Sequence, residues 1–131
     1  MTYDSQHRTI LIVDDNVGTR AFAKRFLEAA GYTVVTAADG AEGLRFYAEH
    51  QSRIVLLLTD VVMPNINGVE LADRVLGMDS QLPVLFMTGG PGRAYRGLEC
   101  IAKPFRSAEL VERVGRVLNA NTHSERAAPA A

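Results

Sequence analysis

Five side chains that could do polar chemistry stand at the ends of short apolar runs in this sequence: Asp14, Asp15, Asp60, Thr88 and Lys103. If the five meet, three carboxylates face one ammonium, and like charges held close together are costly. A divalent cation removes that cost. Mg²⁺ suits such a place because it binds carboxylates and water, usually together with phosphate oxygens. The set therefore predicts a magnesium site that also attracts a phosphoryl group.

A phosphoryl group bound there needs an acceptor and partners for its oxygens. The cation, the Lys103 ammonium and the Thr88 hydroxyl can neutralise or hydrogen-bond its three equatorial oxygens. One carboxylate must then form an acyl phosphate. We predict that Asp60 is this acceptor, because it stands alone at the end of the most apolar run, whereas the adjacent Asp14 and Asp15 suit metal binding. Each residue alone has an ordinary interpretation, as a helix-start acid, a turn residue or a surface lysine. Their joint placement favours the chemistry.

The five side chains share one place only if the apolar runs are strands of one parallel sheet. Apolar, β-branched runs predict strands at residues 9–13, 32–36, 54–58, 82–87 and 99–102. Helical spacing of apolar residues predicts helices at residues 17–30, 41–50 and 68–76, and a last helix that begins at Ser107 and has its final apolar residue at Leu118. This alternation predicts βαβ units, hence a parallel sheet with helices on both faces. In such a sheet ligands bind beyond the carboxyl ends of the strands.

The bulk properties indicate one domain. The chain has 131 residues, of which 47% are hydrophobic and 22% charged, as in ordinary globular proteins. We divide it into an N-terminal extension at 1–8, the domain at 9–119 and a disordered C-terminal tail at 120–131. The net charge of -1 gives no reason to expect nucleic acid. The single cysteine and the lack of a long apolar run predict a cytoplasmic protein with no membrane segment.

Four motifs in this order resemble those of receiver domains in two-component response regulators. They are Ile12-Val13-Asp14-Asp15-Asn16, then Asp60-Val61-Val62-Met63-Pro64 with Gly68, then Met87-Thr88-Gly89, and finally Lys103-Pro104-Phe105. The resemblance covers about residues 8–119. It implies an α/β, flavodoxin-like fold: a five-stranded parallel sheet in the order 2-1-3-4-5 with helices on both faces.

The resemblance also implies a role for each site residue. Asp60 would be the phosphorylated residue, Thr88 would move toward the phosphoryl group, and Lys103 would pair with it. The implied Mg²⁺ ligands are Asp15, Asp60, the carbonyl oxygen of Val62 and, through water, Asp14. The Lys103-Pro104 bond would be cis, which is far less costly before proline than elsewhere.

Two departures from the family pattern change what we expect. The segment between Thr88 and Lys103 is shorter than is common, and the run Gly89-Gly90-Pro91-Gly92 opposes a helix. The fourth helix is therefore expected to be shortened or absent, with only residues 93–96 able to form a turn. In addition, Cys100 occupies a position that is usually Tyr or Phe, so signal readout through that aromatic ring cannot operate here.

Receiver domains take their phosphoryl group from a histidine kinase or a histidine phosphotransfer protein. By resemblance this partner would dock on the first helix, near Asn16, Val17, Arg20 and Lys24. No DNA-binding domain follows in the sequence, so an unknown downstream protein would receive the signal by direct contact. The run that contains Asp60 is similar to that of receivers in hybrid kinases, which relay phosphate.

Other function classes stay open. A pseudo-receiver adaptor would never be phosphorylated, but such domains tend to lose one of the site residues. A phosphatase of the haloacid-dehalogenase type carries a second acid two positions after its nucleophile, and Val62 stands there. We therefore expect no enzyme beyond a domain that catalyses its own phosphoryl acceptance and slow hydrolysis. The resemblance implies that the side chains two residues after the acceptor and two after the threonine orient or obstruct the hydrolytic water. Slow hydrolysis is expected because Val62 and Gly90, which occupy these positions, offer no group that could orient a water molecule.

Overall fold

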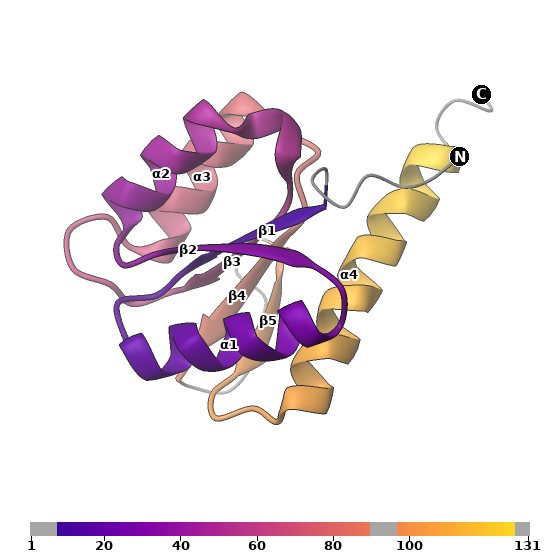
Figure 1. Ribbon diagram of the computed structural model, residues 1–131. Coiled ribbons are helices and arrows are strands. Elements are labelled where there is room, and N and C mark those ends of the chain that lie inside the picture. The colour runs from indigo at the N-terminus through magenta and orange to yellow at the C-terminus, as the bar shows by residue number, and fades with distance from the viewer. Residues whose placement is uncertain (1–7, 90–96, 128–131) are drawn as a thin grey trace.

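Five parallel strands form a single sheet at the centre of the computed structural model, which describes residues 8–89 and 97–127 (Figure 1). The order of the strands is β2-β1-β3-β4-β5. Their bounds are β1 (Thr9–Val13), β2 (Thr33–Ala37), β3 (Ile54–Asp60), β4 (Val84–Thr88) and β5 (Glu99–Ala102). All four pairings are parallel. The predicted fold class and strand order are therefore confirmed.

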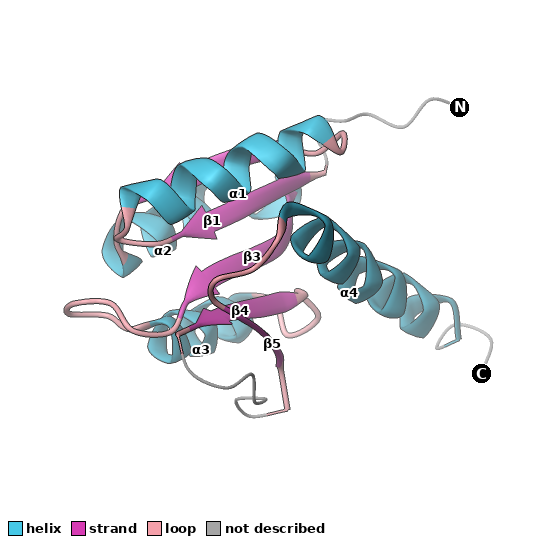
Figure 2. Cartoon of the chain, turned by 90° about the horizontal axis from the view of Figure 1, so that it is seen from below, coloured by secondary structure: helices cyan, strands magenta, loops and turns pink. Residues whose placement is uncertain are grey.

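Helices cover both faces of the sheet, as Figures 1 and 2 show. Their bounds are α1 (Val17–Ala29), α2 (Gly40–Glu49), α3 (Gly68–Met78) and α4 (Ser107–Ala127), with a short 3-10 turn at Gln51–Arg53. Side chains of α2 and α3 form one core with one face of the sheet, and side chains of α1 and α4 form a second core with the other face. Among the described residues, no helix combines the length and the apolarity that a membrane crossing requires.

The strand β3 extends two residues further than the sequence predicts. Thr59 and Asp60 continue the parallel pairing with β4, opposite Phe86 and Met87. Asp60 is therefore the last residue of the central strand, and its backbone is held by the sheet. For an acceptor carboxylate this is a more rigid attachment than a loop position.

Two predictions concern segments near the limits of the described residues. Helix α4 continues to Ala127, so the segment 120–131, predicted to be a tail without secondary structure, begins inside this helix. The missing fourth helix was predicted between β4 and β5; the described residues 89, 97 and 98 are not helical, and residues 90–96 lie outside the described part of the chain.

Strand β5 is bound to α4 at the position of the unusual cysteine. Cys100 is buried, and its carbonyl oxygen accepts a hydrogen bond of 2.6 Å from Nη1 of Arg113. The same guanidinium lies 3.9 Å from the Glu99 carboxylate. An arginine of α4 thus holds the strand that leads into Lys103.

Candidate functional site

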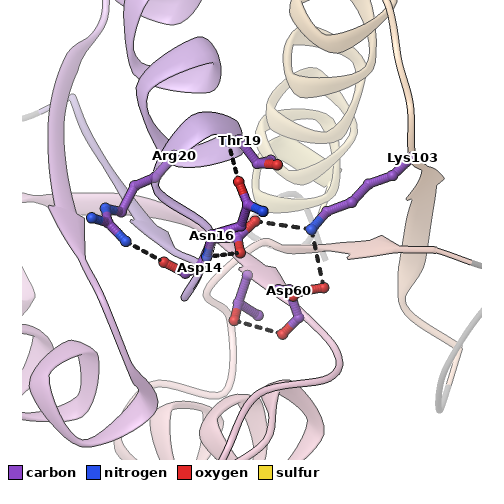
Figure 3. Close-up of polar contacts among 7 residues, drawn as sticks. Asp14, Asn16, Thr19, Arg20, Asp60 and Lys103 are labelled. Atoms are coloured by element: carbon purple, nitrogen blue, oxygen red, sulfur yellow. Dashed lines mark hydrogen bonds and ion pairs between the residues drawn. The ribbon is translucent and has the colours of Figure 1, made fainter.

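The carboxyl ends of four strands bring predicted site residues to one edge of the sheet. Figure 3 shows three of these residues, Asp14, Asp60 and Lys103. Asp14 directly follows β1, Asp60 ends β3, Thr88 ends β4 and Lys103 directly follows β5. Asp14, Asp15 and Asp60 each offer a carboxylate oxygen, and these oxygens lie within 4.8 Å of one another. The structure therefore brings together the acidic cluster that the sequence places at separate strand ends.

Lys103 lies between two of the three carboxylates. Its Nζ is 3.0 Å from Oδ2 of Asp14 and 3.4 Å from Oδ1 of Asp60. Its side chain is 22% exposed, so water only partly screens the charge of the ammonium. One positive charge against three negative ones leaves the cluster strongly anionic, and hard divalent cations bind such oxygen donors. The residues present therefore fit a magnesium ion.

Asp14 is fully buried, and both of its carboxylate oxygens have partners. Oδ1 accepts a hydrogen bond of 2.9 Å from the backbone N–H of Asn16, while Oδ2 pairs with Lys103. Asp15, one residue later, is exposed. The two adjacent acids thus differ: Asp14 is held inside by protein donors, and Asp15 remains available at the surface of the cluster.

The pKa of Asp60 is raised above its ordinary value, chiefly because burial disfavours the ionised carboxylate. The charge and the hydrogen bond of Lys103 act in the opposite direction, and the charges of Asp14 and Asp15 raise the pKa further. Only 8% of the residue is exposed. A cation bound beside Asp60 would favour its ionised, nucleophilic form.

Helix α3 begins against the backbone of β3, the strand that ends at Asp60. The N–H of Gly68, its first residue, donates a 2.8 Å hydrogen bond to the carbonyl oxygen of Val61. A Cβ at residue 68 would collide with the carbonyl oxygen of Asp60 and approach its carbonyl carbon to 2.9 Å. Only glycine permits this approach. The side chain of Val62 is 78% exposed, and its carbonyl oxygen stays a predicted ligand.

Thr88 and Lys103 are joined through the backbone. The carbonyl oxygen of Thr88 accepts a hydrogen bond of 2.7 Å from the Lys103 N–H, and Thr88 itself is 7% exposed. The bond between Lys103 and Pro104 is cis, as the resemblance implies. The hydroxyl and the ammonium therefore come from neighbouring strand ends.

A mostly apolar cavity of about 590 Å³ opens beside Lys103. It is lined by Asn16, Gly18, Thr19, Phe22, Lys103, Pro104 and Phe105. The rings of Phe22 and Phe105 lie 6.0 Å apart, and Phe22 is 36% exposed. Phe105 belongs to the Lys103-Pro104-Phe105 motif, whereas no motif includes Phe22, and only the packing shows that its ring remains accessible.

The predicted docking residues on α1 have different environments. Val17 is 69% exposed, and Lys24 is half exposed and 3.8 Å from Glu28. Asn16 caps the helix by accepting a hydrogen bond from the Thr19 N–H. Arg20, in contrast, turns toward the site and donates a 2.7 Å hydrogen bond to the carbonyl oxygen of Asp14. Nothing in the helical spacing of α1 reveals this inward contact.

Comparison with known proteins assigns the chain to a family. The family model described as the response regulator receiver domain matches residues 10–115. The chain belongs to this family, whose members are signalling domains of two-component systems.

Individual relatives agree with this assignment. The response regulator receiver protein CpdR of Brucella abortus (strain 2308) is 34% identical over 118 residues, which are 85% of this chain and 97% of that protein. The transcriptional regulatory protein PrrA of Mycobacterium bovis is 36% identical, and this chain spans only 49% of its length. The crystal structure of the receiver domain from the hybrid histidine kinase CckA has a TM-score of 0.75 and 38% identity, covering 84% of this chain and 98% of that one.

Proposed function

We propose that this chain is a phospho-receiver that accepts a phosphoryl group on Asp60 from a histidine kinase or a histidine phosphotransfer protein. One observation carries the proposal. Asp60 ends the buried central strand, 3.4 Å from the Lys103 ammonium and within 4.8 Å of oxygens from two further carboxylates. A structural salt bridge would need only one of these acids, whereas phosphoryl transfer needs a nucleophile, a cation site and a counter-charge together.

The transfer would need few groups. A carboxylate oxygen of Asp60 attacks the phosphorus atom, and the bond from phosphorus to the donor nitrogen breaks, with the electron pair leaving on the histidine ring. Lys103 and the Thr88 hydroxyl stabilise the oxygens of the phosphoryl group. Mg²⁺, when bound, would neutralise the charge that develops there.

The proposed Mg²⁺ ligands are Asp15, Asp60 and the carbonyl oxygen of Val62, with Asp14 acting through water. Asp14 already has a partner for each carboxylate oxygen, which supports an indirect role. Asp15 is exposed, which supports a direct one. Titration with Mg²⁺, followed through backbone amides by NMR, should perturb the strand ends. Equal Mg²⁺ affinity in Asp15→Ala would contradict this ligand assignment.

The central experiment is incubation of the protein with acetyl phosphate and Mg²⁺, followed by intact mass. We expect a gain of one phosphate, about 80 Da, that is absent in Asp60→Asn. No gain in the wild-type protein would favour the adaptor function, and a gain that persists in Asp60→Asn would assign the phosphoryl group elsewhere.

Docking of the phosphodonor protein is proposed on the α1 face next to the cavity beside Lys103. Val17 and Phe22 present exposed apolar surface there, and Asn16, Arg20 and Lys24 complete the predicted face. A Val17→Asp change should slow transfer from the protein donor without slowing transfer from acetyl phosphate. The crystal structure of the CckA receiver comes from a hybrid histidine kinase, which supports a relay role for this chain as well.

The downstream partner would be a protein, and the phosphorylated state would be long-lived. Neither Val62 nor Gly90 carries a group that could orient a hydrolytic water, so loss of the phosphoryl group should take many minutes. The decay of the phosphorylated mass after removal of acetyl phosphate measures this lifetime. Decay within seconds would show that water reaches Asp60 unaided.

A further inference from the structure

The turn between β1 and α1 is fixed by side chains at three points (Figure 3). The Asn16 N–H bonds Oδ1 of Asp14 at 2.9 Å, and Oδ1 of Asn16 in turn accepts from the Thr19 N–H at 2.9 Å. The third point is Arg20, whose Nη1 donates to the carbonyl oxygen of Asp14 at 2.7 Å. This carbonyl belongs to the peptide group that joins Asp14 to Asp15.

Asp15 depends on this turn for its position. Its side chain is exposed, and within the part of the chain that the structure describes it makes no hydrogen bond or ion pair. No side-chain contact then holds its carboxylate, so the backbone of Asp15 sets where that carboxylate can reach. Of the three points that fix the turn, only Arg20 holds the peptide group preceding Asp15.

We propose that Arg20 is a positioning residue for the cation site: its guanidinium holds the Asp14–Asp15 peptide so that the Asp15 carboxylate stays with those of Asp14 and Asp60. This inference rests on the proposed role of the acidic cluster in binding Mg²⁺. The contact with the Asp14 carbonyl oxygen uses only Nη1 of Arg20, and a guanidinium has five N–H donors, so this role is compatible with the predicted place of Arg20 on the docking face.

Charge alone predicts the opposite behaviour, which makes the inference testable. Arg20 is a cation near a cation site, so through-space repulsion would weaken Mg²⁺ binding and removal of the charge would strengthen it. Positioning predicts that removal weakens binding. Lysine keeps the charge but lacks the planar guanidinium with its fixed fork of donors, so Arg20→Lys separates the two effects.

The experiment measures the Mg²⁺ dissociation constant by NMR titration for the wild-type protein, Arg20→Met, Arg20→Lys and Arg25→Met. Arg25 is a matched control, because it is an exposed arginine of the same helix whose guanidinium carbon lies 5.4 Å from the centre of the Phe26 ring. We expect both Arg20 variants to bind Mg²⁺ about tenfold more weakly, as is common when a group that orients a metal ligand is lost. Arg25→Met should bind as the wild type does.

Urea unfolding of the same four proteins separates positioning from a purely structural contact. A lower stability of the Arg20 variants with unchanged Mg²⁺ affinity would overturn the inference, as would tighter binding by Arg20→Met. A wild-type protein that binds no Mg²⁺ would instead overturn the proposed metal site, and with it the role assigned to Arg20.

Discussion

Asp60 is held under two opposing influences, since its side chain is largely buried while Lys103 lies 3.4 Å away. Burial is the stronger, and together with the other two acids it raises the pKa of Asp60. The folded protein therefore binds the Asp60 proton more tightly than the unfolded chain does. The stability contributed by the protonated acid is fully present below the unfolded pKa and is lost as the pH rises through the folded pKa.

Replacement of Asp60 by asparagine should therefore stabilise the metal-free protein at about pH 7, because the amide resembles the neutral acid. The advantage should shrink as the pH falls toward the ordinary range of aspartate. Urea unfolding of both proteins in EDTA, at several pH values, measures the difference. A variant that is less stable than the wild type at neutral pH would contradict the dominance of burial.

Replacement of Lys103 by alanine should have two effects, one on stability and one on the response to phosphorylation. In the metal-free protein Lys103→Ala should lower the free energy of unfolding by about 1–3 kcal/mol, because it leaves the buried Asp14 carboxylate without its ionic partner. The variant should still fold and still gain phosphate from acetyl phosphate. It should lose the conformational response, since the lysine charge acts chiefly on a dianionic phosphoryl group. Identical phosphate-induced NMR shifts in variant and wild type would contradict this role.

Among the elements, helix α3 contacts the backbone of Asp60, the proposed acceptor, through Gly68. Asn67 and Glu70 form a capping box at its start, each side chain accepting from the backbone of the other. The cap fixes the first turn, and Gly68 lets that turn contact the backbone of Asp60 and Val61. The position of Asp60 thus depends on a helix terminus as well as on the sheet.

Gly68→Ala should lower stability by about 1–3 kcal/mol, because the added methyl group overpacks a contact with rigid backbone. It should also slow phosphoryl acceptance by displacing Asp60. Gly77→Ala is the matched control in the same helix, where an added Cβ meets nothing within 4 Å. The control should gain about 0.5–1 kcal/mol from helix propensity and keep normal acceptance. Equal effects of the two changes, by urea unfolding and intact mass, would refute the close-contact argument.

In the whole molecule, the acidic cluster and Lys103 lie at the edge of the sheet where four strands end. The two hydrophobic cores cover the two faces of the same sheet. Binding of an ion at that edge to the folded state alone stabilises the fold by mass action. At a Mg²⁺ concentration about one hundred times its dissociation constant, the free energy of unfolding should rise by about 2.7 kcal/mol.

Urea midpoints with Mg²⁺ and with EDTA test this expectation. Asp15→Ala should abolish most of the Mg²⁺ effect while keeping the EDTA midpoint close to that of the wild type. A midpoint that does not respond to Mg²⁺ would argue against an ion site in the folded protein.

The sequence by itself determined the fold class, the strand order through its family motifs, and the five polar residues at the strand ends. These are local properties, because apolar periodicity and short motifs are readable within a few residues. The end of α4 could not be predicted in the same way, since its last residues have no apolar periodicity.

Only the tertiary structure decided how the site residues divide their tasks. Asp14 and Lys103 are in contact although 89 positions separate them in the sequence. Lys103 occupies one carboxylate oxygen of Asp14, whereas the side chain of Asp15 remains exposed. The inward turn of Arg20 and the collision that excludes a side chain at Gly68 arise likewise from packing between elements. Such contacts depend on how strands and helices lie against one another in space, and no local spacing in the chain encodes them.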